Sequence, residues 1–263
     1  MDLGIKGKKA LVCAGSKGLG RASALALAAE GVDIMLCSRS IEALSQAADE
    51  VSKAGGTTVQ ICQADLANHQ SRCKLIREVE EIMGRIDIII HNTGGPKPSS
   101  VENTTLDDWR GGFEQLFQSI AHLNSAFLPG MKERKWGRIV AITSLSVLEP
   151  IANLAISNAM RAAVTSMLKT LSDEVASTGV TVNCVAPGVI HTDRTETLMQ
   201  ARIERSGQSR ETYLQDHLKS IPAGRMGNPD EYGAIIAFLC SQQAAYINGS
   251  TIAVDGGKRR SVY

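Results

Sequence analysis

Aromatic residues are scarce in this sequence, at 4% of 263 residues. Few aromatic side chains leave little surface on which nucleic-acid bases can stack. Charge of one sign is also lacking, because 28 lysines and arginines stand against 27 aspartates and glutamates, for a formal net charge of +1. A balanced charge gives no electrostatic reason to expect binding to nucleic acid or to an anionic membrane. We therefore expect neither partner, and expect a small-molecule substrate instead.

Long apolar runs are also missing. No stretch reaches the ~18 apolar residues that a membrane-spanning helix needs. The segment from Met1 to Gly7 contains no apolar core of the kind that marks a signal peptide. We also find no low-complexity segment and no short repeat. These features lead us to expect a cytoplasmic protein.

Cysteine pairs with metal-ligand spacing are missing too. The six cysteines are Cys13, Cys37, Cys62, Cys73, Cys184 and Cys240, and no two form a Cys-x-x-Cys pair. Four of them lie in or beside short apolar runs, where a thiol behaves as a small hydrophobic side chain. We therefore predict buried, reduced thiols and no metal site.

Short apolar runs alternate with longer helical patterns along the chain. Strands are predicted at 9–13, 32–37, 57–62, 86–90, 138–143, 180–185 and 251–254. Helices are predicted at 19–30, up to about 53, and at 69–83, 106–134, 153–178 and 229–240. Ile86 to Ile90 is too short for a helix and too apolar for an edge strand, which favours the centre of a parallel sheet. The pattern predicts an α/β fold over 1–263: one doubly wound Rossmann-type domain, with about seven parallel strands and helices on both faces.

A polar, charged segment from about 191 to 227 interrupts this alternation. Its charges balance, and the apolar residues scattered among them are typical of amphipathic helices. Ligands of doubly wound sheets bind at the carboxyl ends of the strands. We therefore predict that this segment is an insertion that covers the substrate.

A glycine-rich turn joins the first predicted strand to the first predicted helix. It reads Ala14-Gly15-Ser16-Lys17-Gly18-Leu19-Gly20. Glycines in this context allow a tight turn and a close approach of the backbone to a pyrophosphate, whose charge lies against the helix N-terminus. A tight structural turn is the alternative. The context favours a dinucleotide site that includes Gly15, Ser16, Lys17, Gly18, Leu19 and Gly20.

The end of the second strand favours NADP over NAD. An acidic residue at this place accepts the ribose 2′-OH of NAD, whereas a basic residue favours the 2′-phosphate of NADP. The sequence here is Cys37-Ser38-Arg39-Ser40, with no acidic residue before Glu42. Lys17 would add a second positive charge. We predict an NADP(H) site that includes Ser38 and Arg39, and the alternative is that both cations are ordinary solvated side chains.

With these motifs in place, the chain resembles the short-chain dehydrogenase/reductase family over almost its whole length. The glycine turn is similar to the family's cofactor turn, with Ala14 where threonine is usual. Ile221 to Gly227 and Val254 to Gly257 resemble the tail of β-ketoacyl carrier-protein reductases. The resemblance implies cofactor contacts by Asp65, Leu66, Asn92, Thr93, Gly94, Pro187, Gly188 and Thr192. It also implies a homotetramer, built on the long helices after the fourth and fifth strands and on the last strand.

The catalytic residues depart from the family pattern, which combines a serine, a Tyr-x-x-x-Lys pair and an asparagine. The resemblance assigns the serine to Ser144. Counting from it, the tyrosine position falls on Ser157 and the lysine position on Arg161, while the asparagine position, counted from Trp109, falls on Leu116. A serine hydroxyl is a far weaker acid than a phenol, whose pKa is about 10. Arg161 keeps the positive charge and could donate to the nicotinamide ribose.

Three other side chains are candidates to replace the phenol. Lys97 follows the fourth strand, His191 precedes Thr192, and Tyr213 lies in the predicted insertion. Solvated loop positions are the alternative for Lys97 and His191. We take Ser144, Ser157, Arg161 and Lys97 as the catalytic candidates, and expect His91 to point into the core or the sheet edge.

Three functions remain open at this point. The resemblance favours an NADP(H)-dependent oxidoreductase acting on a carbonyl or an alcohol. The incomplete catalytic set also allows an NADP-binding protein without redox turnover, which is a sensor or a scaffold. The third possibility is a non-redox lyase or isomerase on the same fold.

Overall fold

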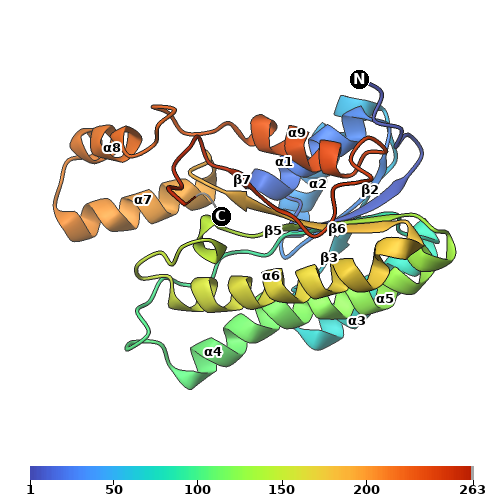
Figure 1. Cartoon of the computed structure of the whole chain (residues 1–263), viewed down its shortest axis with the longest axis horizontal. Helices are drawn as coiled ribbons and strands as arrows, with labels where there is room; N and C mark the ends of the chain where they lie inside the picture. Colours follow the sequence, from blue (N-terminus) through green and yellow to red (C-terminus); the bar gives the residue numbers. More distant parts are fainter. Residues whose placement is uncertain (262–263) are drawn as a thin grey trace.

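A parallel β-sheet forms the centre of the computed structural model, which describes residues 1–261 (Figure 1). Within these residues the sheet has seven strands in the order β3-β2-β1-β4-β5-β6-β7, and all neighbours are parallel. The strands are β1 (Lys9–Cys13), β2 (Asp33–Ser38), β3 (Val59–Gln63), β4 (Ile88–His91), β5 (Gly137–Ile142), β6 (Val180–Pro187) and β7 (Thr251–Val254). The predicted doubly wound fold is confirmed.

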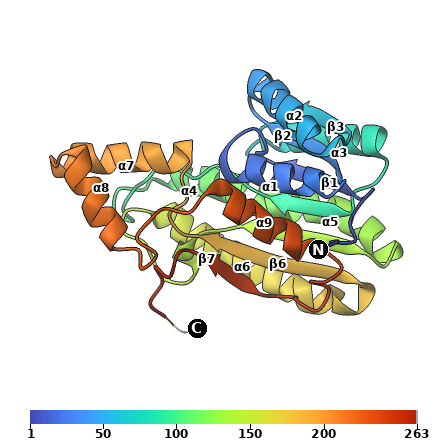
Figure 2. The same cartoon turned by 90° about the horizontal axis from the view of Figure 1, so that it is seen from above.

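Helices cover both faces of the sheet (Figures 1 and 2). One face carries α1 (Gly18–Ala29), α2 (Ile41–Gly55) and α9 (Pro229–Leu239). The other face carries α3 (His69–Met83), α5 (Ser119–Glu133) and α6 (Ala155–Val175), and the short α4 (Leu106–Gly112) leads toward α5. The sequence predicts one helix from 106 to 134, and the structure divides it by a π-helical turn at Phe113–Gln118.

Local signals in the sequence explain where several helices begin and end. The Ser40 side chain accepts a hydrogen bond from the backbone N–H of Ala43 and so caps the start of α2. The same helix ends at Gly56, whose φ of 63° lies in the left-handed region that favours glycine. Asn228 and Glu231 form a capping box at the start of α9. Boundaries of this kind are therefore readable from the sequence.

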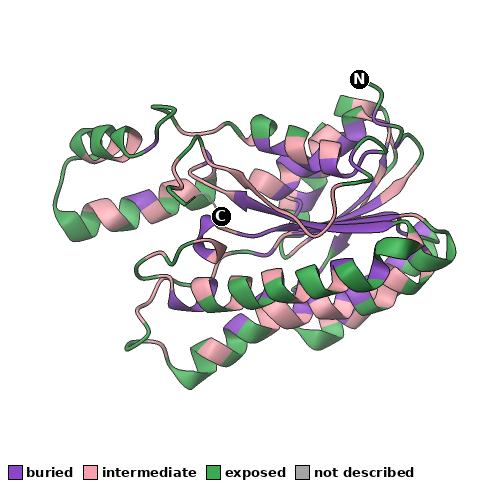
Figure 3. Cartoon of the chain, viewed as in Figure 1, coloured by how far each residue is buried: buried purple, intermediate pink, exposed green. Residues whose placement is uncertain are grey.

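Alternate residues of the strands pack into separate cores on the two faces. Val12 belongs to the core beneath α1, α2 and α9, whereas its neighbour Leu11 belongs to the core on the side of α3, α5 and α6. This follows from the two-residue repeat of a strand. Figure 3 shows the buried residues concentrated along the sheet and on the helix sides that face it. Every residue of β4 is buried, as the apolar run predicts for a central strand.

The cysteines are free thiols, and all are buried except the half-buried Cys73. The pKa values of Cys62, Cys184 and Cys240 are raised to about 12, mainly because these thiols are buried. These thiols are therefore protonated at neutral pH and pack as small hydrophobic groups. The prediction of burial is confirmed for all but Cys73.

Two helices occupy the segment predicted as an insertion, namely α7 (Asp193–Ser206) and α8 (Arg210–Lys219). They extend beyond one end of the sheet (Figures 1 and 2). The hydroxyl of Thr192 caps α7 by accepting from the backbone N–H of Thr195. Among the described residues, no helix combines the length and the apolar character that crossing a bilayer requires.

His91 ends β4 and is buried, as the sequence predicts. Its Nε2 lies 2.7 Å from Oδ1 of Asn124 on α5, so the ring donates to this carboxamide oxygen. Burial lowers the pKa of His91 from 6.5 to about 4. At neutral pH the imidazole is therefore uncharged.

We expect this histidine to make the fold sensitive to acid. Between pH 6.5 and pH 4 the unfolded chain binds the proton and the native chain does not. The contribution of His91 to the free energy of unfolding is fully present above pH 6.5. It is lost progressively as the pH falls from 6.5 through about 4, for a total loss of about 3 kcal/mol. Urea unfolding across this range measures the slope. The His91→Gln variant, which cannot titrate, should have a shallower slope, and equal slopes would contradict the assignment.

Candidate functional site

A cleft of about 670 Å³ lies at the carboxyl ends of the strands. β1 pairs with β2 on one side and with β4 on the other, so the strand order reverses beside β1. Parallel α/β sheets bind their ligands at such a reversal. Most predicted cofactor residues line this cleft: Ser16, Lys17, Gly18, Leu19, Ser38, Arg39, Asp65, Leu66, Asn92, Thr93, Gly94, Arg161, Pro187, Gly188 and Thr192. Gly15 and Gly20 are not among the lining residues, and their part is to shape the turn.

The glycine turn brings the backbone of α1 close to the end of β1. A Cβ on Gly20 would lie 2.3 Å from the carbonyl oxygen of Ala14, and one on Gly15 would lie 2.8 Å from Cδ2 of Leu36. Gly18 has a φ of +53°, in the left-handed region. No side chain caps the N-terminus of α1, in contrast to α2, α3 and α7. Free backbone N–H groups at a helix N-terminus attract a phosphate, so this end of the cleft fits a pyrophosphate.

Basic side chains line the same end of the cleft. Lys17 Nζ lies 3.9 Å from Asp193 Oδ2, and both side chains are mostly exposed, so this ion pair is weak and leaves Lys17 available to an anion. Arg39 is exposed where β2 ends. An adjoining hollow of about 570 Å³ is lined by Arg39, Asp65 and Lys74 among others. The arrangement suits a nucleotide that carries an additional phosphate near the end of β2.

Ser144, Ser157 and Arg161 lie together at the other end of the cleft. Ser144 follows β5, and its Oγ accepts a hydrogen bond from the backbone N–H of Ser146 at 3.1 Å. This leaves the hydroxyl proton of Ser144 free to be donated. Ser157 lies in the first turn of α6 and is buried.

Arg161 is held by two backbone carbonyl groups. Its guanidinium donates to the oxygen of Ile142 at 2.9 Å and to that of Thr93 at 3.5 Å. The pKa of Arg161 is lowered to about 10, mainly because the guanidinium is buried and partly because the positive charge of Arg194 is nearby. Arg161 is therefore protonated at neutral pH, and it has more N–H donors than these two contacts use.

Arg194 is a second cation in this part of the cleft that the sequence patterns do not indicate. It comes from the first turn of α7 and lines the cleft. Its Nη2 donates to the carbonyl oxygen of Pro96 at 2.9 Å. The guanidinium lies against Gly95, where a Cβ would be 2.7 Å from Nη2. This contact joins α7 to the loop after β4 across the cleft.

Residue counting placed Leu116 at the asparagine position, but the structure buries Leu116 and does not bring it to the cleft. The neighbouring Gln115 lines the cleft instead, and its Nε2 donates to the carbonyl oxygen of Gly94 at 3.0 Å. Both residues belong to the π-helical turn, which changes the angular spacing of side chains relative to an α-helix. An offset counted along a regular helix could not reveal Gln115.

The other candidates for proton transfer lie away from the cleft wall. Lys97 is exposed and does not line the cleft, although Gly95 and Pro96 of the same loop do. His191 is also exposed. Tyr213 stacks on His217 within α8, with ring centroids 5.6 Å apart. The structure therefore does not bring Lys97, His191 or Tyr213 to Ser144.

No tyrosine among residues 1–261 lines the cleft. Tyr232 is fully buried in α9, and its hydroxyl donates to the carbonyl oxygen of Val185 at 2.9 Å. Burial raises the pKa of Tyr232 well above its ordinary value. Tyr246 is fully exposed, and Tyr263 lies outside the described residues.

Comparison with known proteins decides the family. Residues 13–259 match the family model described as Enoyl-(Acyl carrier protein) reductase. The chain belongs to the short-chain dehydrogenase/reductase family. The resemblance noted in the sequence is thus confirmed, and it assigns the chain to the oxidoreductases.

Individual members of the family match almost the whole chain. A 3-oxoacyl-[acyl-carrier-protein] reductase of Synechocystis sp. is 35% identical over 250 residues, which are 94% of this chain and 95% of the relative. The NADPH-dependent reductase BacG of Bacillus subtilis is 29% identical over 258 residues, or 97% and 99% of the two chains. The crystal structure of L-sorbose reductase from Gluconobacter frateurii, complexed with NADPH and L-sorbose, matches with a TM-score of 0.94 at 30% identity and covers 100% of both chains.

Proposed function

We propose that this family member is an NADP(H)-dependent oxidoreductase that acts on a carbonyl or alcohol substrate. The observation that carries the proposal is that one continuous cleft joins the uncapped N-terminus of α1 to Ser144 and Arg161. One ligand can therefore reach both ends. The names of BacG and of the L-sorbose reductase complex, which include NADPH, support this choice of cofactor.

The residues present fit the cofactor. The N–H groups of Gly18 and Leu19 would bind the pyrophosphate, and Lys17 and Arg39 the 2′-phosphate of the adenosine. The side of the cleft formed by Asn92 to Gly94, Pro187, Gly188 and Thr192 would hold the nicotinamide half. When bound, the reduced cofactor supplies the hydride.

The chain's own residues polarise the substrate. Ser144 would donate its hydroxyl proton in a hydrogen bond to the substrate oxygen. Arg161 would place a permanent positive charge beside the same oxygen, which stabilises the negative charge that develops there as the carbonyl is reduced. Its two bonds to backbone carbonyls hold the guanidinium in position and cost no reorganisation during the reaction.

The proton has a different source from that of the usual family mechanism. The hydroxyl of Ser157 is too weak an acid to supply it at neutral pH. Lys97 lies outside the cleft wall and is omitted from the catalytic set that we propose. We assign the proton to solvent water, and we assign to Ser157 the binding of that water or of a substrate hydroxyl. The charged α7 would cover the substrate through Arg194 and Leu198.

A screen of NADPH oxidation tests the proposal. Aldehydes, ketones, quinones and 3-oxoacyl thioesters are assayed in parallel with NADPH binding by fluorescence. We expect turnover on at least one class. Tight binding without turnover on any class would support a sensor or scaffold instead. The reason to consider this alternative is that Ser157 stands where the family has its catalytic tyrosine. Failure to bind NADPH would overturn the proposal.

Arg39 should determine the choice between the two nicotinamide cofactors. We expect Arg39→Ala to weaken NADPH binding by about 10- to 100-fold, because charge-assisted hydrogen bonds to a phosphate are lost. NADH binding should stay within about threefold, since NADH lacks that phosphate. Fluorescence titration with each cofactor measures both affinities. Arg110→Ala removes an exposed arginine of α4 and is the matched control. Tighter binding of NADH than of NADPH by the wild type would contradict the assignment.

We also propose that the protein is a cytoplasmic homotetramer. The surfaces expected to associate are α5, α6 and the edge strand β7. Phe113, which leads into α5, is 40% exposed and stacks on Phe117, so an apolar patch borders this surface. Light scattering of the purified chain measures its mass directly, and a monomer would contradict the assembly.

A further inference from the structure

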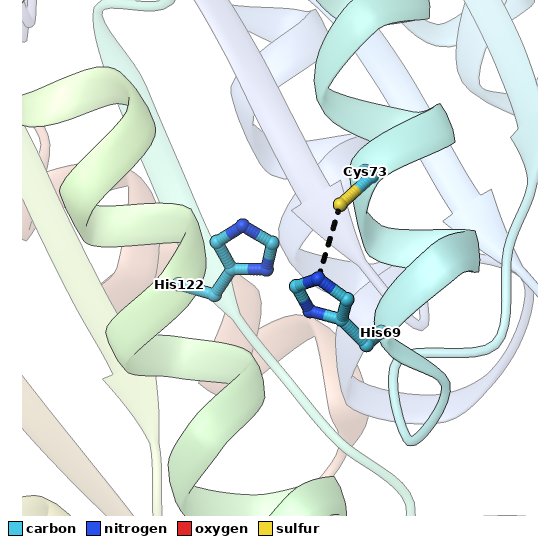
Figure 4. A group of neighbouring side chains, drawn as sticks. All are labelled: His69, Cys73 and His122. Carbon is cyan, nitrogen blue, oxygen red and sulfur yellow. Dashed lines mark hydrogen bonds between the residues drawn. The ribbon is translucent and has the colours of Figure 1, made fainter.

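Two histidines and a cysteine meet between α3 and α5, outside the cleft (Figure 4). His69 and Cys73 are four residues apart on α3, so they lie on the same side of the helix. His122 comes from the adjacent α5 and points toward them. One nitrogen of each histidine and the sulfur of Cys73 all lie within 4.8 Å of one another. We propose that this cluster binds a divalent transition-metal ion, with Zn²⁺ as the preferred ion.

The spacing on α3 already matches two ligands of a single ion. Sγ of Cys73 lies 3.6 Å from Nε2 of His69. In a tetrahedral zinc site the Zn–S distance is about 2.3 Å and the Zn–N distance about 2.0 Å, which places the sulfur and nitrogen about 3.5 Å apart. Little movement on α3 is therefore needed for both atoms to reach one ion.

His122 has to turn before it can complete the site. Its ring is stacked on that of His69, with centroids 5.1 Å apart and planes 18° apart. Arg72 Nε donates to Nδ1 of His122 over a long 3.4 Å, so this nitrogen is unprotonated, as a metal ligand must be. Loss of this weak bond leaves Arg72 with its bonds to the Leu66 carbonyl at 2.7 Å and to Glu114 at 2.9 Å. Glu114 also offsets the charge of Arg72 beside the ion.

The donor set determines the class of ion. Two imidazoles and one thiolate suit Zn²⁺ better than Mg²⁺ or Ca²⁺, which prefer oxygen ligands. On binding, the thiol of Cys73 loses its proton to solvent and forms the metal–sulfur bond, and water occupies the fourth position. His69 is exposed, and Cys73 and His122 are half-buried, so solvent reaches the cluster. A bound ion would tie α3 to α5 and stabilise the fold.

Cobalt(II) is the probe, because a cobalt–thiolate bond gives a charge-transfer absorption that histidine ligation alone does not. The full chain is reduced, stripped with a chelator and titrated with Co²⁺ alone. We expect one equivalent to produce this band, and Zn²⁺ to displace it. Cys73→Ser should abolish the band. His122→Ala should weaken Co²⁺ binding by at least about 10-fold, whereas His217→Ala, the matched control, should leave it unchanged.

Two outcomes of the cobalt titration would each overturn the site. One is a wild-type chain that gives no cobalt–thiolate band, and the other is a band that persists in folded Cys73→Ser. Circular dichroism checks that each variant is folded. If Cys73→Ser does not fold, alkylation of the wild type decides: Zn²⁺ should slow the modification of Cys73, detected on its peptide by mass spectrometry, by at least about 10-fold. An unchanged alkylation rate also overturns the site. None of these measurements depends on NADPH or on turnover.

Discussion

Arg161→Met is expected to lower kcat by about 100- to 1,000-fold, which is the usual effect of removing one group that stabilises a developing oxyanion. The substitution removes the positive charge that we place beside the oxygen of the carbonyl that is reduced, while it preserves most of the side-chain volume. It also leaves the carbonyl oxygens of Ile142 and Thr93 without their guanidinium partner. We therefore expect a loss of about 1–3 kcal/mol in the free energy of unfolding as well. Steady-state kinetics on the substrate found in the screen, together with urea unfolding, measures both effects.

Arg161→Lys separates charge from geometry. Lysine keeps the positive charge but cannot span both backbone carbonyls with a planar group, so it should recover part of kcat and little of the lost stability. NADPH binding is measured on every variant, because Arg161 also lies beside the predicted nicotinamide ribose. A fall in kcat that exceeds any change in NADPH affinity is the expected signature. If Arg161→Met kept kcat within about threefold of wild type, the proposed role of Arg161 would be wrong.

The doubly wound sheet and most helix limits follow from local patterns. β1 contains a run of four apolar residues, Ala10 to Cys13, and α3 begins at a cap that the Asn68 side chain supplies. The proposed cofactor end of the cleft follows from the sequence for the same reason. Its residues occupy the turns that follow successive strands, and parallel strands bring those turns to one edge of the sheet.

The remaining parts of the site depend on contacts between distant segments. Gln115 reaches the cleft through a π-helical turn, and Arg194 reaches Pro96 by spanning the space between α7 and the loop after β4. No local pattern shows either arrangement. The cysteine spacings predict no metal site, because no two cysteines form a Cys-x-x-Cys pair. The cluster that we propose needs His122 from a second helix, and helix packing alone places it beside Cys73.

Gly20→Ala should abolish most cofactor binding. The added Cβ would be 2.3 Å from the carbonyl oxygen of Ala14 and 2.8 Å from Nδ2 of Asn92, so α1 must move by about 1 Å to restore ordinary contact. A displacement of this size breaks a backbone hydrogen bond to the charged pyrophosphate, and loss of one such bond lowers affinity by up to about 100-fold. We expect NADPH affinity to fall by about that factor, and the free energy of unfolding by about 1–3 kcal/mol because the turn is overpacked. Fluorescence titration and urea unfolding give the two values.

Gly111→Ala is the matched control, because Gly111 also lies in a helix but has no atom within 4 Å of an added Cβ. That change should leave NADPH binding intact and raise stability by about 0.5–1 kcal/mol, the helix-propensity difference between glycine and alanine. Both variants thus add one methyl group to a helix, in a crowded place at Gly20 and in open space at Gly111. Normal NADPH affinity in Gly20→Ala would show that the cofactor does not depend on the close approach of α1 to Ala14. The pyrophosphate would then have to bind elsewhere along the cleft.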